Sequence, residues 1–261
     1  MSSVLKNIKG SVAFITGASS GLGRGTAERL ISQGAKVVIF DLPKSEGAKV
    51  AESLGTNAIF VGGDVTNDKS VIDAFNQTKN KFGKLDAIVN CAGIAYAFKL
   101  YNLNKQKMCD FDRVKQTIEV NLLGSLNVIR HGVVLMGENQ RDDQNQRGVI
   151  INTASVAAFD GQIGQVAYSA SKGGIVGSTL PLARDFAKDG IRVNTIAPGL
   201  FHTPMLASLP EKVQTFLAAT VPNPSRLGNV EEYGALVQHI IENRYINGEI
   251  IRLDGAIRMM P

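Results

Sequence analysis

Short apolar runs alternate with longer segments of helical period from residue 11 to the end of the chain. Apolar runs of about four to eight residues bounded by turn residues are typical of buried strands, and apolar positions that recur every three or four residues are typical of helices. We expect strands at 11–16, 36–41, 58–61, 86–90, 148–153, 191–197 and 249–253. We expect helices near 22–33, 44–54, 69–82, 111–136, 165–188 and 229–242. The pattern predicts an α/β fold, a doubly wound and mostly parallel sheet of seven strands with helices on both faces.

Three segments interrupt this alternation. Residues 95–110 and 137–148 are long polar connections, and residues 199–224 hold four prolines among apolar residues. We interpret 137–148 as a solvated surface loop and 199–224 as a substrate lid, because long loops in compact domains are usually functional or mobile. The apolar residues that favour a lid are Phe201, Met205, Leu206, Leu209 and Phe216. Residues 1–9 are expected to be a frayed lead-in, and residues 1–261 a single domain, since no linker divides them.

Composition and charge narrow the class of protein. Apolar residues make up 44% and charged residues 20% of the 261 positions, which excludes a disordered or collagen-like chain. Uninterrupted apolar runs are far shorter than the roughly 18 residues that a membrane span needs, so no membrane insertion is expected. Cys91 and Cys109 are too few for a disulfide scaffold, and no Cys or His cluster has metal-ligand spacing. The net charge of +5 is spread without a basic block, so it indicates no nucleic-acid site.

A glycine-rich turn follows the first expected strand and opens the first expected helix. It reads Thr16-Gly17-Ala18-Ser19-Ser20-Gly21-Leu22-Gly23. Glycines allow a tight turn and let backbone N–H groups approach a pyrophosphate, whose charge is favoured at a helix N-terminus. Asp41 ends the next strand 18 residues beyond Gly23, near the spacing of a ribose-binding acid in a Rossmann dinucleotide site. The alternative interpretation is a turn with a helix-capping Asp.

Asp41 also bears on the choice of cofactor. A carboxylate accepts hydrogen bonds from both ribose hydroxyls of NAD but repels the 2′-phosphate of NADP. Arg24 and Lys44 are nearby in sequence and would offset that repulsion only in part. We therefore expect NAD rather than NADP.

Tyr168 and Lys172 lie four residues apart in an expected helix, so both side chains lie on one face. A phenol has an ordinary pKa of about 10, and a cation about 6 Å away lowers it by about two units at an effective dielectric constant of about 20. The positive nicotinamide ring of an oxidised cofactor would act in the same direction, and together the two charges suit a general base near neutral pH. The alternative is a solvated surface pair, but Gly173, Gly174 and Gly177 weaken this helix, which indicates close approach by another backbone or a ligand.

Two further polar residues belong to the same candidate site. Ser155 comes just after the fifth strand, where ligands of open parallel sheets bind. Asn121 lies inside the helix expected at 111–136, although Asn is a poor helix former. The alternative interpretations are a turn serine that caps a loop and an asparagine bonded to a neighbouring loop.

Together these motifs resemble the short-chain dehydrogenase/reductase family over almost the whole chain. The resemblance implies that Ser155, Tyr168 and Lys172 form the catalytic triad, with Asn121 as the fourth member. It also implies a set of cofactor contacts, namely Gly17, Ser20, Gly21, Leu22, Gly23, Asp41, Asp64, Val65, Asn90, Cys91, Ala92, Gly93, Tyr168, Lys172, Pro198, Gly199 and Thr203. Cys91 departs from the Asn that the family usually has at this position, a change that we expect to be harmless because Asn90 and Gly93 are retained.

Two segments, 147–165 and 247–259, further resemble the 3-hydroxyacyl-CoA dehydrogenases within that family, some of which also act on hydroxysteroids. This implies a homotetramer that uses NAD and an acyl-CoA or steroid substrate, with a tRNA methyltransferase as a partner in mitochondrial tRNA processing. It also implies the mitochondrial matrix if the source is eukaryotic and the cytoplasm if it is bacterial. The rival functions are an NADP-dependent 3-oxoacyl reductase and a structural subunit in RNA processing.

The resemblance and the residue chemistry give each group a role. Tyr168 is expected to remove the substrate hydroxyl proton, and Lys172 to lower the pKa of Tyr168 and bind the nicotinamide ribose. Ser155 is expected to hold the substrate oxygen, and Asn121 to anchor a water that passes protons onward.

Overall fold

A computed structural model describes residues 5–261 and contains one large sheet with the strand order β3-β2-β1-β4-β7-β8-β9. These strands are β1 Val12–Thr16, β2 Lys36–Asp41, β3 Ala58–Gly62, β4 Ala87–Asn90, β7 Gly148–Thr153, β8 Ile191–Pro198 and β9 Ile250–Leu253. Every neighbouring pair in this sheet is parallel. The principal helices are α1 Gly21–Ser32, α2 Gly47–Leu54, α3 Asp68–Phe82, α4 Phe111–Ile118, α5 Ser125–Gly137, α6 Val166–Asp185 and α9 Val230–Glu242. The doubly wound α/β fold predicted from the sequence is confirmed.

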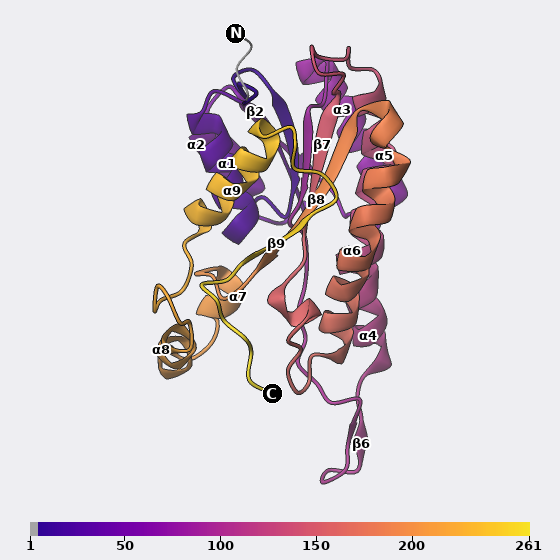
Figure 1. Ribbon diagram of the computed structural model, residues 1–261. Helices are drawn as coiled ribbons and strands as arrows, with labels where there is room; N and C mark the ends of the chain where they lie inside the picture. Colours follow the sequence, from indigo (N-terminus) through magenta and orange to yellow (C-terminus); the bar gives the residue numbers. More distant parts are fainter. Residues whose placement is uncertain (1–4) are drawn as a thin grey trace.

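Helices cover both faces of the sheet because successive strand residues point to opposite faces. In β2, Val37 and Ile39 join the core that includes residues of α1, α2 and α9. Val38 and Phe40 join the other core, which includes residues of α3, α5 and α6. Figure 1 shows these two helix layers on either side of the strands. A strand buried on both faces reads as a continuous apolar run, which is why its position was predictable.

The carboxyl ends of the central strands carry a row of polar residues. Thr16 pairs in register with Asn90, Asn90 with Asn152, and Asn152 with Thr195. The chain order reverses between β1 and β4, and ligands of doubly wound sheets bind in the crevice at such a point. The fold therefore places the candidate site at this edge.

The helix expected at 111–136 consists of α4, a π-helix η1 (Glu119–Gly124) and α5. By length and composition alone, Phe111–Gly137 is apolar enough to cross a membrane. Half of its most apolar window is buried within this fold, where the segment packs against α3 and α6. Polar residues interrupt the apolar residues of this segment, so the length of its uninterrupted apolar runs did not indicate a possible span. Burial against the sheet accounts for its apolar face.

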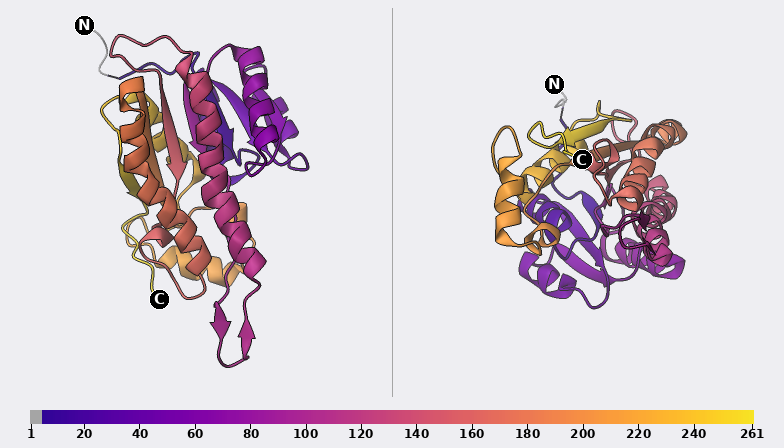
Figure 2. Two further views of the ribbon diagram at one scale, coloured as in Figure 1. Left: turned by 90° about the vertical axis from the view of Figure 1, so that its right-hand side faces the viewer. Right: turned by 90° about the horizontal axis from the view of Figure 1, so that it is seen from below.

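Two of the long connections contain elements that the sequence did not predict. Residues 95–110 form a projecting hairpin of β5 (Tyr101–Asn102) and β6 (Lys107–Met108), seen at the lower end of Figure 1 and in the left view of Figure 2. The expected lid contains α7 (Pro204–Ala207) and α8 (Glu211–Ala219), with α8 at the same end of the molecule. Two adjacent antiparallel strands need only two residues each here, which is too short a pattern to detect.

The lid prediction was wrong for Phe201. This side chain is 6% exposed and packs edge-on against the ring of Tyr233, with 6.3 Å between ring centroids. Leu206 is also buried, whereas Leu209 and Phe216 are exposed. The side chain of Met205 lies outside what the structure describes. Of the five apolar residues that favoured a lid, Leu209 and Phe216 are the two that the structure shows to be exposed.

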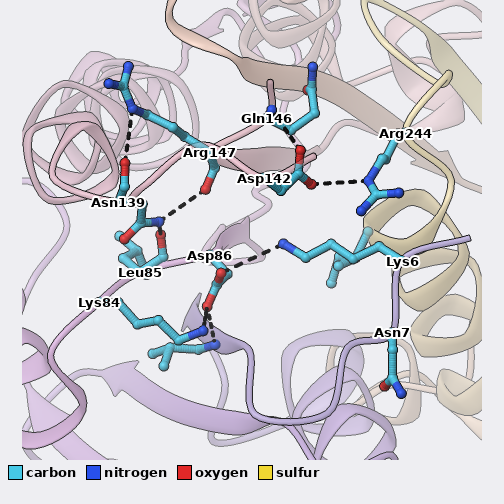
Figure 3. Close-up of polar contacts among 12 residues, drawn as sticks. Lys6, Asn7, Lys84, Leu85, Asp86, Asn139, Asp142, Gln146, Arg147 and Arg244 are labelled. Atoms are coloured by element: carbon cyan, nitrogen blue, oxygen red, sulfur yellow. Dashed lines mark hydrogen bonds and ion pairs between the residues drawn. The ribbon is translucent and has the colours of Figure 1, made fainter. Parts of the chain in front are cut away.

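The segment 137–148 is not simply a solvated loop, because polar contacts fix it to the amino-terminal edge of the sheet (Figure 3). The Asn139 side chain donates to the carbonyls of Leu85 (2.6 Å) and Arg147 (3.0 Å). Arg244 donates to the carboxylate of Asp142 at 3.1 Å. Hydrogen bonds to backbone groups explain how so polar a segment is held in place.

The described part of the expected lead-in, from residue 5 onward, also contacts the rest of the fold. The backbone N–H of Lys6 donates to the carbonyl of Glu242 at 2.9 Å, and Ile8 is 2% exposed in the core. The Lys6 ammonium lies 3.7 Å from the carboxylate of Asp86 (Figure 3). Residues 6–9 are therefore not frayed, because Ile8 is a core residue; residues 1–4 lie outside the described part of the chain.

Candidate active site

The glycine-rich turn is packed backbone against backbone. Gly17 has a φ of +64°, and a Cβ added there would lie 2.8 Å from the backbone of Ala92 in the loop after β4. A Cβ on Gly23 would lie 2.4 Å from the carbonyl oxygen of Gly17. Gly21 has a φ of +52°, and its added Cβ would meet the methyl group of Thr203 at 3.4 Å. A side chain would collide with backbone at Gly17 and Gly23, and the positive φ of Gly21 favours glycine there. Ser20 is exposed just before α1, and Leu22 is half-buried in its first turn.

Asp41 is tied to this turn. One carboxylate oxygen, Oδ2, accepts hydrogen bonds from the backbone N–H of Ser19 at 3.0 Å and from its hydroxyl. The other, Oδ1, accepts from the N–H of Leu42 at 2.8 Å. Arg24, which we considered as a charge to offset Asp41, instead pairs with Glu28 at 2.8 Å. The structure therefore brings Asp41 to the turn without that cation.

Asp64 and Val65 lie in the loop that follows β3. The Asp64 carboxylate accepts from the N–H and the hydroxyl of Thr66, both at 2.9 Å. Val65 is buried, its carbonyl accepts from the Asn127 side chain at 2.9 Å, and its side chain fills the space beside Gly124. These contacts hold the loop at the carboxyl end of β3, and the role of the two residues in adenine binding stays a prediction.

The segment 90–93 forms the floor of the site. The Asn90 side chain donates to Asn152 Oδ1 at 2.9 Å across two strands. The backbone N–H groups of Cys91 and Ala92 both donate to Thr16 Oγ1 at 3.1 Å. A Cβ on Gly93 would lie 3.5 Å from the Lys172 ammonium. The segment therefore connects the glycine-rich turn to the Tyr168 and Lys172 region.

Cys91, where the family usually has Asn, joins a buried polar cluster. The Thr153 hydroxyl donates to Cys91 Sγ at 3.5 Å and lies 2.7 Å from the hydroxyl of Tyr233. Burial raises the pKa of the Cys91 thiol and raises that of Tyr233 well above its ordinary value. Both groups are therefore neutral at neutral pH, and the thiol fits its site as a small apolar residue.

Tyr168, Lys172 and Ser155 lie together. The Lys172 ammonium lies 5.8 Å from the centroid of the Tyr168 ring and donates to the Thr153 carbonyl at 2.8 Å. The Ser155 side chain forms a hydrogen bond with Tyr168 and also accepts from the N–H of Ala157 at 3.1 Å. Lys172 is 4% exposed and Tyr168 is half-buried. The alternative of a solvated surface pair is thus wrong for Lys172.

The expected direction of the Tyr168 pKa was wrong for the protein without its cofactor. Burial raises the pKa of Tyr168 above 10, and the hydrogen bond from Ser155 offsets only part of this effect. Burial also lowers the pKa of Lys172 to about 8. The pKa expected for Tyr168 included the attraction between phenolate and ammonium but not the loss of hydration that both groups undergo on burial.

Asn121 lies in the π-helix and is fully buried. Its amide donates to the carbonyl of Ile94 at 2.9 Å and to the Ser171 hydroxyl at 3.0 Å, while the N–H of Ile94 donates to its side-chain oxygen at 2.8 Å. The Ser125 hydroxyl donates to its backbone carbonyl at 2.9 Å. The structure thus shows the asparagine bonded to a neighbouring loop, and its role as a water anchor stays a prediction. A π-helix within an α-helix frequently marks a functional site.

Pro198 and Gly199 end β8 at the same edge. Pro198 is buried, and the N–H of Gly199 donates to the carbonyl of Leu253 at 2.9 Å. A Cβ on Gly199 would lie 2.8 Å from the Asp254 side chain. Thr203 begins α7 and faces the glycine-rich turn, as noted above for Gly21. Their contact with nicotinamide stays a prediction.

The sequence did not indicate the residues whose hydrogen bonds support this site. Thr16, Thr153 and Tyr233 support the floor, and Ser19 fixes Asp41. Each is an ordinary strand, turn or helix residue in sequence, and only the alternation of β7 indicates that Thr153 points away from Asn152. Within residues 5–261, no three His, Cys, Asp or Glu side chains gather in a way that could hold a metal ion.

Comparison with known proteins identifies the family of this chain. Residues 11–214 match the family model for short chain dehydrogenases. The chain is 59% identical to human 3-hydroxyacyl-CoA dehydrogenase type-2 over the full length of both, and 33% identical to a 3-oxoacyl-(acyl-carrier-protein) reductase of Vibrio cholerae over 97% of this chain and all of the relative. A crystal structure of 3-hydroxyacyl-CoA dehydrogenase type-2 from Mycobacterium avium superposes with a TM-score of 0.93 at 38% identity, covering 98% of this chain and 99% of that one. The chain belongs to the short-chain dehydrogenase family.

Proposed function

We propose that this protein is an NAD-dependent dehydrogenase that interconverts 3-hydroxyacyl-CoA and 3-oxoacyl-CoA. The observation that carries the proposal is the packing of Tyr168, Lys172 and Ser155 beside a glycine-rich turn at the carboxyl ends of the strands. The substrate class is inferred from the full-length identity of 59% to a relative with the name 3-hydroxyacyl-CoA dehydrogenase type-2. Fold alone would not give a substrate.

The chain's own residues fit a nicotinamide dinucleotide. Gly17, Gly21 and Gly23 keep side chains away from the backbone at the N-terminus of α1, where a pyrophosphate is favoured. Asp41 offers acceptors to a ribose diol, and Lys172 offers a donor beside Gly93 on the nicotinamide side. When bound, the cofactor accepts or returns a hydride at its nicotinamide ring.

The Tyr168 hydroxyl carries the proton in this proposal. It gives the proton to the substrate oxygen during reduction and takes it back during oxidation, while Ser155 donates a hydrogen bond to the same oxygen. A pKa raised by burial keeps the hydroxyl protonated at neutral pH in the free protein, which suits the reductive direction. The Lys172 ammonium, held by the Thr153 carbonyl, stabilises the phenolate that forms when the proton leaves.

Asp41 favours NAD over NADP, and thereby a dehydrogenase over an NADP-dependent reductase. A 2′-phosphate would approach a carboxylate that is held in place by hydrogen bonds from the turn. Arg24, which follows the turn on α1, pairs with Glu28. We propose that the exposed Leu209 and Phe216 cover the acyl chain or a steroid.

We also propose a homotetramer, supported by an unpartnered face of α6. A Cβ on Gly173 or Gly177 would meet nothing within 4 Å, although a Cβ on Gly174 would contact Leu122 at 2.6 Å. Leu180 is exposed on the same helix. Within the described chain, only one of the three glycines serves a close approach, so a second copy is the occupant that we propose for the others. Sedimentation of wild type and Gly177→Leu tests this. We expect a tetrameric wild type and smaller species for Gly177→Leu; a monomeric wild type would contradict an interface on this face, and a dimeric wild type would contradict the tetramer.

The function is tested by a substrate panel with the purified full-length protein. The account predicts that kcat/KM for acetoacetyl-CoA reduction with NADH exceeds that with NADPH, and that it exceeds kcat/KM for hydroxysteroid oxidation with NAD. Asp41→Ala is the matched variant and should reduce the preference for NADH. Absence of acyl-CoA turnover would refute the reaction, and equal use of NADH and NADPH by the wild type would refute the cofactor.

A further inference from the structure

Ser19 is the one residue of the glycine-rich turn that contacts Asp41 through both its backbone and its side chain. Its N–H donates to Asp41 Oδ2 at 3.0 Å, and its hydroxyl donates to the same oxygen. The N–H of Leu42 donates to Oδ1 at 2.8 Å. The carboxylate is therefore held by the turn after β1 on one side and by the end of its own strand on the other.

We propose that Ser19 is a specificity-determining residue that positions Asp41 for the ribose diol of NAD and so increases discrimination against NADP. The proposal rests on the proposed use of NAD. Without the serine hydroxyl, the carboxylate would keep only the backbone donors of Ser19 and Leu42 and would rotate away from an incoming 2′-phosphate at a lower cost. A carboxylate held by three donors must break charge-assisted hydrogen bonds first, and these are about twice as strong as neutral ones.

The neighbouring residues are consistent with this role. Ser19 is partly buried, whereas the adjacent Ser20 is exposed. Arg24, which follows on α1, pairs with Glu28 and so offers no ready partner for a 2′-phosphate. Discrimination therefore depends on where the Asp41 charge is fixed, and Ser19 contributes two of the three donors that fix it.

An alternative role for Ser19 is a direct contact with the ribose. The two roles differ in their effect on NADPH. Loss of a direct contact with the 3′-hydroxyl weakens NADH and NADPH alike, because both cofactors have that group. Loss of a direct contact with the 2′-hydroxyl lowers selectivity equally with and without Asp41. Loss of a positioning contact weakens NADH but leaves NADPH unchanged or tightens it, since the carboxylate becomes free to move away.

The experiment is calorimetric titration of the full-length protein with NADH and with NADPH. Variants are Ser19→Ala, Asp41→Ala, the double variant, and Ser19→Thr, which retains the hydroxyl. Ser32→Ala is the matched control, because Ser32 is an exposed serine at the other end of α1 that contacts the Arg29 carbonyl. All variants are first checked for an unchanged melting temperature.

We expect Ser19→Ala to lower the NADH-over-NADPH selectivity about tenfold, the loss of one hydrogen bond to a charged group. Ser19→Thr and Ser32→Ala should keep the wild-type selectivity. In the Asp41→Ala background, the second change should alter selectivity less than about twofold, because a positioning residue has no effect without the group that it positions.

Two results would overturn the proposal. One is an equal weakening of NADH and NADPH by Ser19→Ala, and the other is a loss of selectivity that is the same with and without Asp41. Because no substrate is present, a wild type that discriminates between the coenzymes but turns over no acyl-CoA would refute the proposed reaction and leave the role of Ser19 standing.

Discussion

Replacing Lys172 with Met should make the folded protein more stable while it removes activity. Lys172 is 4% exposed, and burial lowers its pKa from 10.5 to about 8. One pH unit corresponds to about 1.4 kcal/mol, so a charged Lys172 at pH 7 costs the folded state about 3 kcal/mol. Loss of the bond to the Thr153 carbonyl offsets about 1 kcal/mol of the gain. The expected net increase in unfolding free energy is therefore about 2 kcal/mol at pH 7.

The sign of the pH dependence follows from the lowered pKa. Below pH 8 the lysine is charged in both states and the penalty is complete. Between pH 8 and 10.5 the folded state releases the proton while the unfolded state still holds it, so wild-type stability rises with pH. Above 10.5 the lysine is neutral in both states and the penalty disappears. The advantage of Lys172→Met should thus decrease by about 2 kcal/mol between about pH 7 and about pH 9.5.

Urea unfolding of both proteins at these two pH values, at one protein concentration, measures this difference. Lys105→Met is the matched control, because Lys105 is exposed on the hairpin and its substitution should give the same difference at both pH values. A Met variant that is less stable than wild type at pH 7, or an advantage that does not change with pH, would refute the reasoning.

Three further predictions follow from the site. Ser155→Ala should move the acidic limb of the pH profile for hydroxyacyl-CoA oxidation to higher pH, because the Ser155 hydrogen bond lowers the pKa of Tyr168; an unmoved limb contradicts this. Gly17→Ala, at a φ of +64° and with backbone 2.8 Å from the new Cβ, should lower the unfolding free energy by more than about 1 kcal/mol in urea. Tyr233→Phe should lower it by about 1 kcal/mol, because the hydroxyl bonded to Thr153 at 2.7 Å is lost; unchanged urea midpoints would contradict both.

The strands of the sheet could be predicted because a strand that is buried on both faces is apolar over several consecutive residues. The strand β7 contains an apolar run at residues 149–151, and its bounds of 148–153 were predicted without error. The spacing of Tyr168 and Lys172 could also be read directly, because helix geometry places i and i+4 on one face. Ser155 followed from its place at a strand end.

What the sequence did not reveal depends on contacts between distant segments. Phe201 belongs to the core because α9 brings Tyr233 against it, and no local period records that contact. The pKa of Tyr168 depends on how deeply the fold buries the side chain, so the attraction to Lys172 could be predicted from the sequence but the desolvation could not. The side chain of Asn121 likewise forms hydrogen bonds with Ile94 and Ser171, which lie 27 and 50 residues away in sequence.

The Tyr168 hydroxyl carries the proton in the proposed reaction, and the most direct measurement is acetoacetyl-CoA reduction by Tyr168→Phe with NADH. We predict a fall in kcat of about a thousandfold, with the Kd for NADH within about threefold of wild type. Tyr245→Phe, at a tyrosine that is 99% exposed, serves as the matched control and should turn over normally. A Tyr168→Phe enzyme that keeps most of its turnover would contradict the central claim.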